Sequence, residues 1–310
     1  MLRAGLVTRR VALVGSTASG KSSVAMEVAR QSRSTAVDVE LVSVDSMQVY
    51  RGMDIGTAKP TVEEQAEVRH HCIDVVDADE DFTVGDFKPA HDAAIADMSE
   101  RGASALLVGG TGLYHRVVID DFDLPGEFPA VREELDADAD TESMHTRLQE
   151  LDPLAASRME SGNRRRVVRA LEVTLGSGRP FSSFGPGVNT YEESAVEQIG
   201  LRWPRPVVAE RVAARVHAMV GAGLIDEVVG LHESGMSRSA GQALGYKEIV
   251  DHLEGRIGKD EAIETIITRT RQFAVRQDRW FRRDPRVRWI DVEHDPVREV
   301  VPIVMEALTR

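Results

Sequence analysis

The sequence predicts an α/β fold: a parallel sheet flanked by helices, interrupted by a mostly helical insertion. Short runs rich in apolar and β-branched residues occur at 11–14, 40–44 and 103–108, and helical patterns follow the first run at 21–30 and precede the third at 87–101. Strands and helices that alternate at this spacing form βαβ units and therefore a parallel sheet. From about Asp121 consecutive helical patterns replace this alternation, which indicates a separate helical part.

The individual elements follow from local signals along the chain. The helix at 87–101 should end at Gly102, because glycine readily adopts the left-handed conformation that closes a helix. Glycine- and proline-rich segments bound four helical patterns in the insertion, at 130–139, 142–151, 153–160 and 164–175. A strand at 199–203 and long helices at 206–221 and 260–283 follow. We therefore expect a core of residues 1–121 and 199–310 around a helical insertion, 122–198.

Composition narrows the class of protein. Of the 310 residues, 42% are hydrophobic and 29% charged, which is enough apolar material for a normal core. The single cysteine, Cys72, excludes an internal disulfide, and we expect His70 and His71 beside it to pack in the core rather than bind a metal. No N-terminal apolar stretch reaches the length of a signal sequence or membrane span. We expect a cytoplasmic protein without a membrane segment, and nothing demands more than a monomer.

Charge is distributed unevenly along the chain. The formal net charge of −13 argues against a protein that coats nucleic acid. Acidic residues concentrate at 61–100 and 120–142, however, whereas arginines concentrate at 158–180 and 263–290. The arginines of the last segment that share one helical face are either a solvated surface or a surface that binds a polyanion: Arg269, Arg276, Arg279 and Arg283.

The clearest motif is the segment GSTASGKS at residues 15–22, which fits the phosphate-binding pattern GxxxxGK[ST]. It lies where that motif must lie, after a strand and at the start of a helix, so backbone N–H groups and the helix N-terminus favour an anion. Lys21 supplies a positive charge for the terminal phosphate, and the Ser22 hydroxyl can ligate Mg²⁺. We expect the whole segment to bind a di- or triphosphate: Gly15, Ser16, Thr17, Ala18, Ser19, Gly20, Lys21 and Ser22.

The acidic residue expected of a nucleotide hydrolase is missing from its usual place. The apolar run at 103–108 is followed by Gly109, Gly110, Thr111 and Gly112, without an acid that could hold magnesium. Asp45 instead follows the second predicted strand, at the sheet edge where such folds bind ligands. From the residues alone, Asp45 is either a base that faces the reacting end of the phosphate substrate or the N-cap of a following helix.

Several blocks of sequence together resemble the tRNA dimethylallyltransferases, also called tRNA isopentenyltransferases. They occur in the family's order between about residues 11 and 289: GSTASGKS at 15–22, VDSMQVYRGMDIGTAKP at 44–60, VGGTGLY at 108–114, RRVVRALE at 165–172, GYKE at 245–248 and TRQFAVRQDRW at 270–280. Two positions depart from the family's pattern. Ser16 stands where proline is common and Ser22 where threonine is commoner, and both substitutions preserve the backbone cradle and a hydroxyl for magnesium.

The resemblance implies transfer of a dimethylallyl group from dimethylallyl diphosphate to the exocyclic N6 amine of the adenine on the 3′ side of the tRNA anticodon. Asp45 would be the general base, a role that typically contributes about 10²–10⁴ in rate. Lys21, Arg215 and a Mg²⁺ on Ser22 would stabilise the leaving diphosphate. Thr111 would bond to the adenine or its neighbour. Without the resemblance, Arg211 and Arg215 are interpreted as part of a solvated helix face and Thr111 as a turn residue.

Contacts with the anticodon stem-loop are implied by the resemblance and by the positive charge of the insertion. The residues expected to make them are Asp45, Ser46, Met47, Gln48, Thr111, Arg132, Arg165, Arg166, Arg169, Gln242, Tyr246 and Lys247. Two other functions remain open from the residues alone. An ATP-dependent small-molecule kinase would leave the block at 108–114 and the arginine-rich insertion unexplained. An RNA-binding regulator with a vestigial loop would leave Asp45, Lys21 and Ser22 unexplained.

Overall fold

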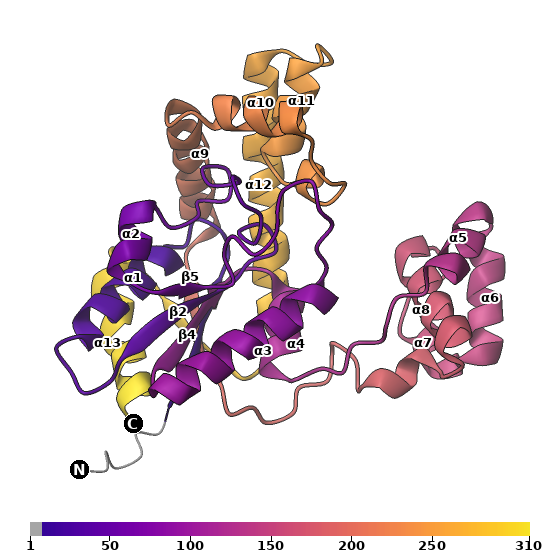
Figure 1. Cartoon of the computed structure of the whole chain (residues 1–310), viewed down its shortest axis with the longest axis horizontal. Coiled ribbons are helices and arrows are strands. Elements are labelled where there is room, and N and C mark those ends of the chain that lie inside the picture. Colours follow the sequence, from indigo (N-terminus) through magenta and orange to yellow (C-terminus); the bar gives the residue numbers. More distant parts are fainter. Residues whose placement is uncertain (1–7) are drawn as a thin grey trace. The chain divides into compact units, whose positions relative to one another are not determined.

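The computed structural model describes residues 8–310, which form two compact units (Figure 1). The larger unit combines the chain up to Ile119 with Tyr191–Arg310, and the smaller unit is Asp120–Thr190. The larger unit holds one parallel sheet flanked by helices, whereas the described elements of the smaller unit are all helical. The predicted fold class is therefore confirmed.

The sheet has six strands in the order β3-β2-β4-β1-β5-β6, and all its pairs are parallel. The strands are β1 (Arg10–Gly15), β2 (Val39–Val44), β3 (His70–His71), β4 (Ser104–Gly109), β5 (Glu197–Arg202) and β6 (Val287–Asp291). Sequence reasoning expected four of them but neither edge strand, because β3 is too short for a periodic signal and β6 follows an arginine-rich helix.

The register brings the carboxyl ends of three neighbouring strands to the same edge. Gly109 of β4 pairs with Val14 of β1 on one side and with Val44 of β2 on the other. The residues that follow these strands, including Asp45 and Gly110, therefore emerge together. Ligands bind at this edge in open α/β sheets.

Side chains of the central strands alternate between two hydrophobic clusters, one on each face of the sheet. Val11 and Leu13 of β1 join a cluster with α1 (Lys21–Ser32) and α13 (Pro296–Thr309), whereas Ala12 and Val14 face the opposite cluster. That second cluster contains residues of α3 (Val84–Arg101), α4 (Gly112–Ile119) and α12 (Lys259–Phe281). Figure 1 shows α1 and α13 on one side of the strands and α3 and α4 on the other.

The remaining elements of the larger unit are α2 (Val62–Glu67), α9 (Arg205–Gly221), α10 (Leu224–Ser234), the 3₁₀ turn η2 (Ala240–Gln242) and α11 (Tyr246–Leu253). Local signals set several of their ends. Thr61 and Glu64 form a capping box at the start of α2, and Gly102 closes α3 in the left-handed conformation that the sequence predicted.

The smaller unit contains α5 (Pro129–Ala137), α6 (Thr141–Leu151), α7 (Pro153–Ser157), α8 (Arg164–Ser177) and the 3₁₀ turn η1 (Phe181–Phe184). It has a hydrophobic core of its own, which includes Leu135, Leu148, Val167 and Leu171. We expected the third of these helices to end at residue 160. Helix α7 ends earlier, at Ser157, because the chain turns ahead of Asn163, whose side chain caps α8. Within residues 8–310, no helix is both long and apolar enough to cross a membrane.

Candidate active site

Residues 15–22, here called the phosphate loop, connect β1 to α1 and depend on two glycines. The φ angles are 148° at Gly15 and 98° at Gly20, a region that side chains disfavour. Neighbouring atoms also exclude a side chain there. A Cβ on Gly15 would lie 2.8 Å from the carbonyl oxygen of Leu201, and one on Gly20 would lie 2.7 Å from Cγ of Pro296.

Contacts from outside the loop hold its middle. The Arg211 Nε donates to the carbonyl oxygen of Ala18 over 2.7 Å, and the Trp203 Nε1 donates to that of Ser19 over 2.9 Å. The guanidinium of Arg211 also lies over the Trp203 ring, 4.8 Å from its centroid. Arg211 therefore supports the loop and is not part of a freely solvated helix face.

The ammonium group of Lys21 lies within the curve of the loop. Its Nζ donates to the carbonyl oxygens of Gly15 over 3.0 Å and Ser16 over 2.7 Å. The pKa of Lys21 is lowered from 10.5 to about 7, mainly by burial and then by the nearby charge of Arg215, while the charge of Asp45 opposes both effects. A lysine that titrates near neutrality takes up a proton readily when an anion enters beside it.

Asp45 directly follows β2, and its negative charge acts on Lys21 of the phosphate loop. Its Oδ1 accepts the N–H of Met47 over 2.9 Å, which orients the carboxylate. No described residue donates a hydrogen bond to Oδ2, so that oxygen is available to a ligand. The next helix, α2, begins only at Val62. The N-cap alternative for Asp45 is therefore wrong, because the chain after it forms turns instead of a helix.

The phosphate loop and Asp45 line the same pocket, which has a volume of about 130 Å³. Lys21, Ser22, Asp45 and Arg215 all line it, and Arg215 reaches it from α9. Burial lowers the pKa of Arg215, and the charge of Asp45 opposes that effect. Other residues in the walls are Ala25, Met26, Leu41, Ser43, Gln48, Pro60, Glu64, His70, Val108, Phe273 and Gln277. The pocket thus combines the cations Lys21 and Arg215, the carboxylates Asp45 and Glu64, and several apolar side chains.

The turn after β4 lies beside Asp45. The N–H of Ser46 donates to Oγ1 of Thr111 over 3.2 Å. Gly109 permits this approach, because a Cβ there would lie 2.1 Å from the carbonyl oxygen of Val44. The structure therefore brings Thr111 next to Asp45 and Ser46.

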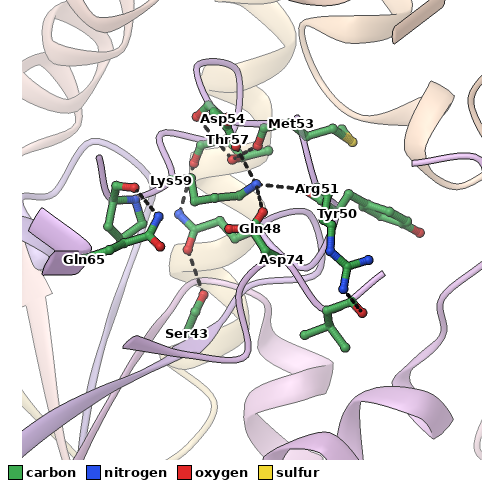
Figure 2. Close-up of polar contacts among 12 residues, drawn as sticks. Ser43, Gln48, Tyr50, Arg51, Met53, Asp54, Thr57, Lys59, Gln65 and Asp74 are labelled. Atoms are coloured by element: carbon green, nitrogen blue, oxygen red, sulfur yellow. Dashed lines mark hydrogen bonds and ion pairs between the residues drawn. The ribbon is translucent and has the colours of Figure 1, made fainter. Parts of the chain in front are cut away.

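Residues 45–60, here called the anchored segment, contribute to the lining of the pocket and form no regular helix or strand. Figure 2 shows polar contacts that hold this segment. Gln48 ties its beginning to its end: Oε1 accepts from the Ser43 hydroxyl over 2.7 Å, and Nε2 donates to the carbonyl oxygens of Thr57 over 3.2 Å and Ala58 over 3.1 Å. The amide of Gln48 is therefore engaged within the wall of the pocket.

Lys59 is the main internal anchor of this segment (Figure 2). Its side chain is 1% exposed, and Nζ donates to the carbonyl oxygen of Tyr50 over 2.7 Å. It also forms ion pairs with Asp54 at 2.6 Å and Asp74 at 2.7 Å. Three partners satisfy all the donors of the ammonium group, which a buried charge requires.

A carboxylate from a different part of the chain holds the tip of the anchored segment. Glu227 of α10 accepts the backbone N–H groups of Asp54, Ile55 and Gly56 at 3.1, 2.7 and 3.2 Å. The Tyr246 hydroxyl donates to the same carboxylate over 2.5 Å. Burial, followed by the effect of Glu227, raises the pKa of Tyr246. In this structure the fully buried Tyr246 side chain supports the anchored segment and does not face solvent.

The other residues expected to contact tRNA differ in their exposure to solvent and in their salt bridges. In the larger unit, Gln242 lies exposed in η2 and Lys247 is half-buried on α11. In the smaller unit, Arg165 and Arg166 are exposed and form no salt bridge with any residue of 8–310. Arg132 pairs with Asp136 at 2.8 Å, and Arg169 pairs with Glu172 at 2.7 Å.

The arginines of α12 and of the turn after it are partly engaged by their own protein. Arg269 pairs at 2.6 Å with Glu248, a buried carboxylate. Arg276 and Arg283 lie over the rings of Phe273 and Trp280, at 5.7 and 4.6 Å from the ring centroids. Aromatic stacking leaves the polar edge of a guanidinium available, whereas the ion pair of Arg269 occupies it.

Lys59, Glu227 and Gln277 were not among the residues expected at the site. All three act by holding backbone groups, which leaves no periodic or compositional signal. Lys59 and Gln277 fall inside the blocks that carry the family resemblance, and this is the only sequence signal that could have indicated them.

Comparison with known proteins supplies the family. The family model described as IPP transferase matches residues 48–284. The chain belongs to the IPP transferase family. Two relatives named tRNA dimethylallyltransferase, from Nocardioides sp. and Paenarthrobacter aurescens, are 42% identical over 305 residues and 44% identical over 306 residues. Each alignment covers 96% of both chains. The predicted family is confirmed.

Solved structures of IPP transferases have the same fold. The tRNA isopentenylpyrophosphate transferase of Bacillus halodurans is 39% identical, with a TM-score of 0.68 over 97% of this chain and 96% of that one. A eukaryotic dimethylallyltransferase acting on tRNA is 24% identical, with a TM-score of 0.75 over 92% of this chain and 74% of that one. The second likeness concerns the fold alone.

The pocket offers a donor set of oxygens. The Ser22 hydroxyl and the Asp45 carboxylate line it, and no cluster of three or more His, Cys, Asp or Glu side chains suited to a metal occurs within 8–310. Mg²⁺ prefers oxygen ligands, retains several waters and commonly binds through substrate phosphates. These residues therefore fit a Mg²⁺ carried mainly by a diphosphate.

Proposed function

We propose that this protein transfers the dimethylallyl group of dimethylallyl diphosphate to the exocyclic N6 amine of the adenine 3′-adjacent to the tRNA anticodon, with release of diphosphate. The observation that carries the proposal is the pocket in which Lys21, Ser22 and Arg215 share one space with Asp45. Membership of the IPP transferase family, whose relatives are named for this reaction, supports it.

The cationic end of the pocket would receive the diphosphate. As the allylic C–O bond breaks, negative charge grows on the leaving diphosphate, and fixed donors that face it lower the barrier. Lys21, Arg215 and the N–H groups of the phosphate loop are suited to this task. Mg²⁺ bound with the Ser22 hydroxyl would add further neutralisation of the phosphate oxygens.

Asp45 would act on the acceptor. The lone pair of an adenine amine is delocalised into the ring, so the amine is a weak nucleophile until its proton is accepted. The anchored Oδ1 of Asp45 and its available Oδ2 suit a carboxylate that receives that proton. Thr111, which lies against Ser46, would hydrogen-bond the adenine or its neighbour.

The anticodon arm would be held by exposed arginines and polar groups. An adenine must leave its stack to enter a pocket, and a single-stranded loop makes this less costly than a duplex. Arg165 and Arg166 are the best-placed contacts on the insertion, since no described residue forms a salt bridge with either. We propose that the protein is a monomer. We also propose that it acts in the cytoplasm, on tRNA.

The alternative of an ATP-dependent small-molecule kinase has weaker support. It shares the phosphate loop and an acid after the second strand, but it gives no role to the contact between Thr111 and Ser46 or to the exposed arginines of the insertion.

The direct test is incubation of the purified chain with dimethylallyl diphosphate, Mg²⁺ and unmodified tRNA, followed by mass spectrometry of the nucleosides. We expect dimethylallyl adenosine and an equal amount of diphosphate. A tRNA with another base at the position after the anticodon is the control and should remain unmodified. ATP-dependent phosphorylation of a metabolite without any prenyl transfer would favour the kinase instead.

The role of the insertion can be tested separately with the double variant Arg165→Ala, Arg166→Ala. Each phosphate contact that is lost should flatten the dependence of log K on log salt concentration by about 0.7–0.9. We expect weaker tRNA binding with unchanged affinity for dimethylallyl diphosphate. An unchanged salt slope in a filter-binding titration would remove these arginines from the RNA contact.

A further inference from the structure

Gln277 of α12 joins two turns at the edge of the sheet. Its Oε1 accepts the backbone N–H of Thr17 over 2.7 Å, and its Nε2 donates to the carbonyl oxygen of Gly110 over 2.9 Å. The side chain is 6% exposed and lines the pocket. One amide therefore spans from the phosphate loop to the turn that follows β4.

The two backbone partners define the chemistry that this position needs. The N–H of Thr17 can only donate and the carbonyl of Gly110 can only accept, so the bridge requires one acceptor and one donor on a single planar group. A glutamine amide supplies both in the orientation observed. Gly110 is part of the same fit, because a Cβ there would lie 2.3 Å from Nε2 of Gln277.

The bridge connects the two halves of the proposed reaction. Thr17 belongs to the loop proposed to hold the diphosphate. Gly110 precedes Thr111, whose hydroxyl accepts from Ser46 beside the proposed base Asp45. The path from Thr17 to Asp45 thus passes through three hydrogen bonds, two made by Gln277 and one between Ser46 and Thr111.

We propose that Gln277 is a positioning residue that sets the separation between the diphosphate cradle and the acceptor side of the pocket. This inference rests on the proposed prenyl transfer. The attacking nitrogen and the allylic carbon must approach to about 3–3.5 Å, and a misplacement of about 1 Å can reduce the rate by about 10². Loss of the bridge should therefore slow the chemical step and leave the binding of both substrates nearly unchanged.

The first test compares Gln277→Met with Gln198→Met. Gln198 of β5 is equally buried and bonds to His115 at 2.8 Å, but it does not line the pocket. For Gln277→Met we expect kcat to fall by about 10–100-fold, with the KM for each substrate within about threefold of the parent. Gln198→Met should lose comparable stability to urea while its kcat stays near that of the parent.

The second test uses Gln277→Glu, which keeps the shape of the side chain. An ionised carboxylate still accepts from Thr17 but cannot donate to Gly110, whereas a protonated carboxyl group does both. Burial raises the pKa of a carboxyl group, and the carboxylates Asp45 and Glu64 of the same pocket act in that direction, whereas the cations Lys21 and Arg215 oppose it. The kcat of this variant, divided by that of the parent, should therefore rise as the pH falls from about 8 to about 5.5. The corresponding ratio for Gln277→Met should stay flat.

The inference is overturned if Gln277→Met retains the parent kcat, if Gln198→Met loses as much, or if the ratio for Gln277→Glu does not change with pH. Should Gln277→Met fail to fold, the pH profile of Gln277→Glu decides alone. A parent protein that forms no prenylated tRNA would contradict the proposed function itself, which is a different result from any of these.

Discussion

The phosphate loop and the anchored segment both line one pocket but are held in different ways. The phosphate loop has strong local determinants, two glycines with positive φ and Lys21, which donates to carbonyl oxygens five and six residues earlier, and distant side chains then hold its middle. The anchored segment has no regular structure, and its tip bonds to Glu227, more than 170 residues away.

This difference separates the two substrates of the proposed reaction. The affinity of the phosphate loop for diphosphate depends on a helix N-terminus and on turned backbone N–H groups, which suit anions in general. The wall that would face the adenine exists only when α10 and α11 are packed beside it. We therefore expect changes in the anchored segment to affect turnover and stability while leaving diphosphate binding intact.

The largest effect should come from Asp45→Ala, at the junction of the two halves. Loss of a general base should lower kcat by about 10²–10⁴, without loss of tRNA or diphosphate affinity. Single-turnover transfer to tRNA measures this directly. Asp45→Asn is the matched control, because it keeps an oxygen for the N–H of Met47 but accepts no proton. Near-normal turnover in Asp45→Asn would remove Asp45 from the base role.

Lys59→Met should remove the contacts that hold the anchored segment in place. It leaves the carbonyl of Tyr50 and two carboxylates without their partner, although both carboxylates are partly exposed and can be solvated again. We expect a loss of about 2 kcal/mol in the free energy of unfolding by urea. Inorganic diphosphate should still bind with nearly parental affinity.

The matched control for this variant is Lys259→Met, which removes an exposed lysine at the start of α12. It should change the free energy of unfolding by less than about 0.5 kcal/mol. If Lys59→Met weakened diphosphate binding as strongly as it weakened tRNA prenylation, the two walls would not be independent.

The protonation of Lys21 provides a separate test of diphosphate binding to the phosphate loop. The pKa of this group is lowered to about 7, so at about pH 8 most of the amine is neutral in the free protein. A bound diphosphate favours the charged form, so binding should take up as much as about one proton per site. Affinity should therefore fall as the pH rises above 7.

Calorimetry of inorganic diphosphate binding in buffers of different ionisation enthalpy measures that uptake. Diphosphate titrates in the same range, and Lys21→Met corrects for it because the ligand is common to both proteins. The uptake by the parent should exceed that by the variant. Equal uptake would show that Lys21 does not change its protonation state when the ligand binds.

The smallest expected effect is that of Tyr246→Phe, which removes one hydrogen bond to Glu227 and leaves the three backbone N–H groups in place. We expect a loss of about 1 kcal/mol in stability, with a modest fall in turnover. A double-mutant cycle with Glu227→Gln isolates the pair. A coupling energy of zero would mean that the hydroxyl does not help to hold the anchored segment.

Local sequence patterns were sufficient for most of the fold. Apolar runs predicted β1, β2, β4 and β5, and the glycine at 102 predicted the end of α3. Patterns of this kind failed for the edge strand β3, which is two residues long, and for the helix expected to reach residue 160, which ends at Ser157. Local signals are weakest where an element is short or where a neighbouring segment competes for the same residues.

The candidate site divides in the same way. The pattern GxxxxGKS and the position of Asp45 after a strand were visible in the chain, and the pocket brings these residues together. The burial of Tyr246 against Glu227 was not visible, since it depends on the packing of α10 and α11 against residues 54–56. Residues that hold backbone groups carry no signature, because any backbone presents the same N–H and C=O groups to them.

For this protein, the sequence alone determined the α/β class, the phosphate loop and the family, because strand periodicity, glycine conformation and motif spacing are properties of neighbouring residues. Only the tertiary structure decided that Gln277 bridges Thr17 to Gly110 and that Glu227 and Lys59 hold the anchored segment. The physical reason is that a hydrogen bond acts over about 3 Å in space. Which distant residues come within that distance is settled when the helices pack against the sheet.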